Sequence, residues 1–126
     1  IDQMLKNVLK KNVKFIFTPH LSPMFRGILS TIYIDLTKKS SQGKIIKSLL
    51  DFFKKKNFVK INTKNKLIST NDVINTNYCH ISVCKTKYKN KLVILSAIDN
   101  LIKGGAGQAI QNLNIKYNFP EKVGLE

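Results

Sequence analysis

The sequence has few of the residues on which metal-binding, secreted or membrane-spanning proteins depend. Two cysteines, at positions 79 and 84, lack the spacing of a metal site, and no second pair completes one. Free thiols in a reducing cytosol are the simpler interpretation, so we expect a cytoplasmic protein without a metal ion. No apolar run approaches the roughly 20 residues that span a bilayer, and no leader-like segment is present, so we expect no membrane partner.

Acidic residues are also scarce, since 7 Asp and Glu accompany 22 Lys and Arg, for a formal net charge of +15. This excess makes a basic nucleic-acid-binding module one alternative, which a salt-dependent gel shift would test. However, the lysines are scattered, and aromatic residues do not alternate with them as in a base-stacking surface. The abundance of Lys, Asn and Ile indicates an AT-rich coding sequence instead, so we expect no nucleic-acid partner.

Arginine is the rarest basic residue, because Arg26 stands alone beside 21 lysines. A guanidinium group binds carboxylate or phosphate through two parallel hydrogen bonds, which an ammonium group cannot do. The presence of Arg26 therefore suggests a geometric need. An anionic substrate, a structural salt bridge and chance survival all remain open as explanations.

The order of apolar periodicities predicts one domain in which helices and strands are mixed. We expect helices over residues 2–11, 41–56 and 100–117, and strands over 13–18, 27–36, 58–61, 78–85 and 91–97. Ser40 or Ser41 is expected to cap the second helix, and residues 67–74 remain ambiguous. Because strict βαβ alternation is missing and residues 86–90 suit a hairpin turn, the pattern predicts an α+β fold. Its sheet should be mixed, largely antiparallel, and covered by helices on one face.

Three glycines, at positions 104, 105 and 107, stand where the last predicted helix begins. Each glycine inside a helix costs roughly 0.5–1 kcal/mol relative to alanine, so close approach of a ligand or of a neighbouring element would explain them. Asp99 or Asn100 can cap this helix, and the N–H groups that follow can bind an electron-rich partner. Composition leaves packing and ligand binding equally open.

Three segments share a family pattern. They are FTPHLSPMFRGILSTIY at 17–33, TNYCHISV at 76–83, and DNLIKGGAGQAIQNLN at 99–114 with FPEKVGL downstream. In this order they resemble the C-terminal part of N-acetyl-gamma-glutamyl-phosphate reductases, which belong to the aspartate-semialdehyde dehydrogenase-like superfamily. The chain departs from that pattern at Gly105, where the family has alanine, and at His80, where it usually has an acid.

The resemblance implies an oxidoreductase that reduces N-acetyl-glutamyl 5-phosphate to the semialdehyde with NADPH, in arginine biosynthesis. The family's nucleophilic cysteine lies in an N-P-G-C-Y-type segment, and neither Cys79 nor Cys84 does. Residues 1–5 resemble those that follow the family's H-R-H-x-P-E segment, which carries its histidine base. No glycine-rich dinucleotide fingerprint is present either. We therefore expect the C-terminal third of an enzyme, with no catalytic residue of its own and no activity alone.

The resemblance also implies two groups of site residues. Arg26 and His20 would bind the substrate, although a hydrogen bond that tethers the backbone is equally open for His20. The coenzyme, NADP, would lie against residues of the last motif, namely Asn100, Lys103, Gly104, Gly105 and Gly107.

The implied domain organisation divides the chain near residue 98. Residues 1–98 would form an α+β substrate and dimerisation domain, and residues 99–126 a helix and tail that return to a missing N-terminal nucleotide-binding domain. We expect a homo-oligomer that acts on a small-molecule substrate. A related reductase of lysine biosynthesis, or a degraded gene product without a role, remain as alternatives.

Overall fold

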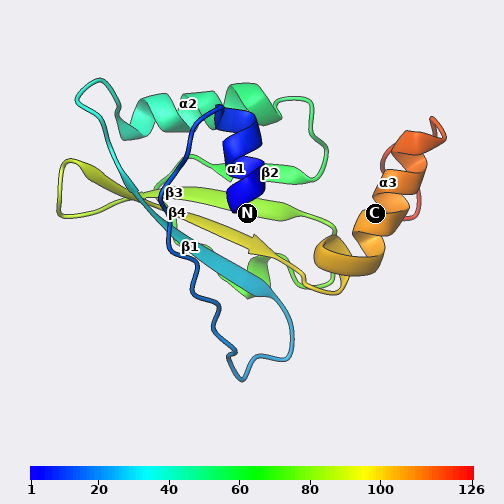
Figure 1. Ribbon diagram of the computed structural model, residues 1–126. Coiled ribbons are helices and arrows are strands. Elements are labelled where there is room, and N and C mark those ends of the chain that lie inside the picture. The colour runs from blue at the N-terminus through cyan, green and yellow to red at the C-terminus, as the bar shows by residue number, and fades with distance from the viewer.

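A computed structural model, which describes residues 1–126, contains one four-stranded sheet in the order β1-β4-β3-β2 (Figure 1). The strands are β1 (Ile28–Asp35), β2 (Val59–Asn62), β3 (Cys79–Lys85) and β4 (Lys91–Ile98). Strand β4 runs antiparallel to both β1 and β3, which confirms the predicted hairpin, whereas β2 pairs with β3 in parallel. The predicted α+β class with a mixed, largely antiparallel sheet is confirmed.

Three α-helices accompany the sheet, and one of them packs across it. They are α1 (Asp2–Leu9), α2 (Gln42–Phe53) and α3 (Gly107–Lys116), and two short helical turns are η1 (Thr70–Asp72) and η2 (Ile102–Ala106). Ser41 caps α2 as expected, since its hydroxyl accepts a hydrogen bond of 3.3 Å from the Lys44 N–H. Helix α2 contacts β2 and β3, whereas α3 stands beyond the end of the sheet (Figure 1). None of the helices has the length and apolar character needed to cross a membrane.

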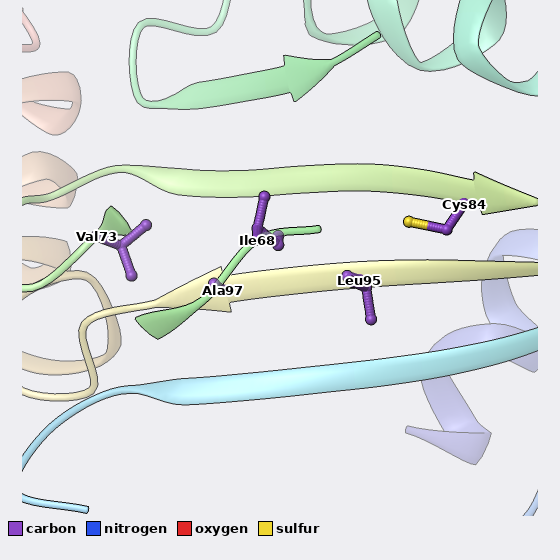
Figure 2. Close-up of a cluster of buried hydrophobic side chains, with 5 residues drawn as sticks. All are labelled: Ile68, Val73, Cys84, Leu95 and Ala97. Atoms are coloured by element: carbon purple, nitrogen blue, oxygen red, sulfur yellow. The ribbon is translucent and has the colours of Figure 1, made fainter. Parts of the chain in front are cut away.

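The hydrophobic core lies on the two central strands. Cys84, Leu95 and Ala97 point to one face of the sheet, where Ile68 and Val73 from the segment before β3 cover them (Figure 2). Val83, which points to the opposite face because side chains alternate along a strand, is also fully buried. The sheet is therefore covered on both faces at β3, by α2 on one and by a loop on the other.

Two sequence predictions of local structure were wrong. Residues 13–18 form no strand although their side chains alternate, and Ile16 is 93% exposed. A strand needs a partner as well as a pattern, and the segment makes no ladder with β1, whose outer edge is unpaired. The helix expected over 100–117 is divided at Gly105, whose backbone leaves the helical region, so that η2 precedes α3.

Candidate functional site

The site is organised around Asp99, which directly follows β4 and has no exposed side-chain surface. Its carboxylate accepts hydrogen bonds from the backbone N–H groups of Asn75, Leu101 and Ile102 at 2.8, 2.8 and 2.9 Å. Two of these bonds bind the start of η2, but the N-cap position is Leu101 rather than Asp99 or Asn100, which the sequence had suggested. Burial opposes ionisation of Asp99, but the three N–H groups and the charge of Arg26 outweigh it and hold the pKa below its ordinary value.

Arg26 turns its guanidinium group toward that carboxylate. Its Nε lies 3.1 Å from Asp99 Oδ2, its Nη2 donates to Asp99 Oδ1 at 3.3 Å, and its Nη1 donates to Asn75 Oδ1 at 2.9 Å. The structural salt bridge, one of the explanations left open by the sequence, is therefore present. The second N–H of each Nη atom has no protein partner, and 18% of the side chain is exposed, so the outer edge of the group stays available to a ligand.

Gly27 and Asn100 join the start of β1 to the same junction. The Gly27 N–H donates to Asn100 Oδ1 at 2.7 Å, across 73 residues of sequence. Gly27 has a φ of 105°, and a Cβ there would lie 2.6 Å from Thr70 Cβ, so only glycine fits. The Asn100 oxygen is thus used within the chain, while its NH₂ group has no protein partner.

The glycines of the last motif have different environments. Gly107 is buried, and a Cβ there would overlap Asn77 Oδ1 and lie 2.7 Å from Ile102 Cγ2. Gly104 and Gly105 are exposed, and a Cβ at either would meet only ordinary contacts at 3.5 Å. Packing within the domain therefore accounts for Gly107, but it does not account for Gly104 or Gly105.

Lys103 points into the domain rather than away from it. Its Nζ donates to Gln111 Oε1 at 2.7 Å, and the same oxygen accepts a bond of 2.9 Å from Asn77 Nδ2. Gln111 Nε2 in turn donates to Glu121 Oε1 at 2.6 Å, which ties the C-terminal tail to α3. Burial lowers the pKa of Lys103, and the nearby Cys79 and Glu121 oppose that shift.

His20 lies apart from this junction in an exposed loop. Its Nδ1 is 3.1 Å from the Thr18 carbonyl oxygen, which is the backbone-tethering contact that the sequence left open. Nε2 has no protein partner. The structure thus brings Arg26, Asn100 and the glycine-rich turn together, but not His20.

Some members of the junction were missed from the sequence. Asn75 adopts a φ of 62°, a left-handed conformation that asparagine tolerates, and this lets its N–H reach Asp99. Asn77, Gln111 and Glu121 all lie inside the segments that resemble the family, so that resemblance was the signal that could have found them. No group of three or more His, Cys, Asp or Glu side chains is arranged to hold a metal ion.

Comparison with known proteins identifies the family to which this chain belongs. The family described as "Semialdehyde dehydrogenase, dimerisation domain" matches residues 1–100. The chain belongs to the semialdehyde dehydrogenase family. Among its relatives, a Clostridium kluyveri protein named N-acetyl-gamma-glutamyl-phosphate reductase is 46% identical over 125 residues, or 99% of this chain. Proteins of the same name from Geobacter metallireducens and Thermoanaerobacter sp. (strain X514) are 43% and 41% identical over 126 residues, the whole chain.

This semialdehyde dehydrogenase chain spans little more than a third of the relatives it matches, 36% of the Clostridium kluyveri protein and 37% of the Thermoanaerobacter protein. The predicted resemblance to the C-terminal part of N-acetyl-gamma-glutamyl-phosphate reductases is confirmed.

The two glycine environments give a matched pair of substitutions. Gly107→Ala should destabilise the chain by about 1–3 kcal/mol, because the new methyl group overlaps Asn77 and Ile102. Gly104→Ala should leave stability within about 1 kcal/mol or raise it, because its methyl group has room and alanine favours the helix. Urea unfolding followed by circular dichroism measures both, and equal losses would contradict the assignment of Gly107 to packing.

Replacing the buried carboxylate should have a larger, pH-dependent effect. Asp99→Asn leaves Arg26 without its counter-ion, and we expect a loss of about 3 kcal/mol at pH 7. Because folding lowers the pKa of Asp99, its stabilisation is complete above the unfolded value of about 3.9 and is lost as the pH falls through the folded value. The difference between wild type and Asp99→Asn in urea unfolding should therefore shrink toward pH 3, and a constant difference would refute this role.

Proposed function

We propose that this chain is the C-terminal part of an N-acetyl-gamma-glutamyl-phosphate reductase, an oxidoreductase that converts N-acetyl-glutamyl 5-phosphate to N-acetyl-glutamate semialdehyde. One observation carries the proposal. The three segments that resemble the family meet at one junction, through Arg26 and Gly27 of the first, Asn77 of the second, and Asp99 and Gln111 of the third. The chain therefore has hydrogen bonds between the three segments, in addition to their sequence motifs.

NADPH is the coenzyme we propose, and it supplies the hydride for the reduction. The fit rests on the exposed backbone of Gly104 and Gly105, where no side chain prevents a flat ring from approaching. The free NH₂ group of Asn100 adds a donor beside this surface. Gly107 holds the glycine-rich turn in place by packing on Asn77.

For Lys103 we propose a different role from the coenzyme binding that the resemblance implies. Its ammonium group donates to Gln111, so we propose that it orients the glycine-rich turn from within the domain. A coenzyme contact by Lys103 would need this hydrogen bond to break.

Arg26 is proposed to bind the substrate through the outer edge of its guanidinium group. Asp99 holds the inner edge, and the partly exposed Nη atoms keep donors for a phosphate or carboxylate. His20 is proposed as a second substrate contact through Nε2, since Nδ1 is occupied by the Thr18 carbonyl oxygen. We assign no catalytic residue to this chain.

The partner surfaces follow from exposed apolar side chains. Ile110 and Leu113 of α3 and Tyr117, which directly follows it, have helical spacing and are 41, 50 and 60% exposed. We propose that residues 99–126 pack on an N-terminal nucleotide-binding domain, and that residues 1–98 form the substrate and dimerisation domain of a homo-oligomer.

A chimeric enzyme tests the proposal. Residues 1–126 would replace the matching region of the Clostridium kluyveri reductase, and we expect the rest of that protein to supply the coenzyme-binding domain and the nucleophile. We expect NADPH-dependent reduction of N-acetyl-glutamyl phosphate with kcat/KM within about tenfold of the parent, because the segments that contact the active site match. The assay follows NADPH absorbance. A folded chimera that is inactive would refute the proposal, and preference for the longer or carrier-bound substrate would favour the reductase of lysine biosynthesis.

In the same chimera, Arg26→Lys should lower kcat/KM by at least about tenfold, because lysine keeps the charge but loses the paired hydrogen bonds. Asn75→Gly is the matched control, since glycine tolerates the backbone of Asn75 and removes only one acceptor of Arg26. Steady-state kinetics compare the two variants. Equal losses would show that Arg26 acts through the junction rather than on the substrate.

A further inference from the structure

A cavity lies at the β2 edge of the sheet, and the junction residues Arg26, Asp99 and Asn100 do not line it. It has a volume of about 330 Å³ and is formed by β2, the loop that follows it, η1 and β3. None of the residues proposed above for substrate or coenzyme lines it. Its charged and titratable lining residues are Lys60, Lys64, Lys66, Asp72 and His80.

Sheet geometry brings two of these groups together. Lys60 and His80 are register partners on β2 and β3, so their side chains point to the same face as neighbours. The Lys60 ammonium lies 3.7 Å from the centre of the Tyr78 ring, in a cation–π contact. Lys66 is fixed by its main chain, since its carbonyl oxygen accepts a hydrogen bond from the Ser82 hydroxyl.

The lining is rich in donors without partners. The Nζ atoms of Lys60, Lys64 and Lys66 and both ring nitrogens of His80 make no hydrogen bond within the chain. The one carboxylate, Asp72, is already engaged, because its Oδ2 accepts hydrogen bonds from the N–H and hydroxyl of Ser69 at 2.7 and 3.2 Å. The three lysines therefore outweigh the single carboxylate in one concavity.

We propose that this cavity binds a small phosphorylated molecule, whose phosphate group is held by Lys60, Lys66 and His80. Ammonium and imidazole N–H groups form their strongest hydrogen bonds with such oxyanions. The volume is at the lower end of the range for small-molecule sites, which suits a compact metabolite. The site is separate from the proposed reductase chemistry, so either proposal can fail without the other.

The pKa of His80 should change when the cavity is occupied. Burial lowers its pKa, Lys60 and Lys66 lower it further, and Asp72 opposes them. A bound phosphate would offset the charge of the lysines and accept a hydrogen bond from an N–H of the His80 ring, so it should raise the pKa of His80. The only other histidine, His20, lies in an exposed loop outside the cavity and provides an internal control.

The experiment titrates the 126-residue chain with inorganic pyrophosphate at constant ionic strength and follows both histidines by NMR. We expect saturable shifts of the His80 ring signals and a rise of its pKa by at least about 0.5, with little change at His20. Lys66→Gln should weaken binding by at least about fivefold, and Lys89→Gln, which removes the same charge from the β3–β4 turn, by less than about twofold.

Three results would overturn the proposal. The first is a titration without saturation at His80, and the second is a parallel shift of His20. The third is an equal effect of Lys66→Gln and Lys89→Gln, which would reflect the general charge of +15. A short single-stranded oligonucleotide that shifts His80 at lower phosphate concentration than pyrophosphate would show a nucleic-acid contact instead. His80→Asp, with its fold checked from the amide spectrum, should abolish the shifts of neighbouring backbone signals.

Discussion

The carboxylate of Asp99 is the constraint on which the rest of the site depends. A buried charge is tolerated only when hydrogen bonds and an opposite charge replace water, and Asp99 obtains these from Arg26, Asn75 and the start of η2. Arg26 lies 73 residues from Asp99 in sequence and just before β1. Its hydrogen bond to the Asp99 carboxylate therefore also fixes the position of the start of β1. The junction therefore couples the strand that carries Arg26 to the turn that carries the glycines.

The glycine-rich turn combines a tightly packed glycine with two exposed ones, a difference that composition alone could not reveal. Gly107 lets the turn settle on Asn77, and the wide turn of η2, with Gly104 N–H bonded to the Asp99 carbonyl oxygen at 2.9 Å, directs the other two glycines outward. Packing on one side holds the backbone still, and the absence of side chains on the other leaves it accessible. The coenzyme contact proposed for this turn would need both properties, because ordering a mobile backbone on binding would cost entropy.

The sequence predicted the central sheet better than its surroundings, for a physical reason. Strands β3 and β4 are apolar over most of their length and bury both faces, so pattern and environment agree. Residues 13–18 carry an equally clear alternation, yet a pattern does not specify a pairing partner. In the site, the structure brings Arg26 and Asn100 together at the junction, and their contacts with substrate and coenzyme stay predictions. The direction of Lys103 and the part played by Glu121 depend on tertiary contacts that no local signal encodes.

The balance between core and surface bears on how this domain is stabilised. Only 14 of 126 residues are buried, while Phe17, Phe25 and Tyr117 are 66, 96 and 60% exposed. Exposed apolar surface of this extent is typical of protein interfaces. A partner that covers it stabilises the folded state in proportion to the logarithm of its concentration over Kd. Because Phe25 adjoins Arg26 and α3 directly follows η2, whose start Asp99 binds, docking at either surface would also tighten the junction. The same contacts would then support both the stability of the domain and the geometry of its site.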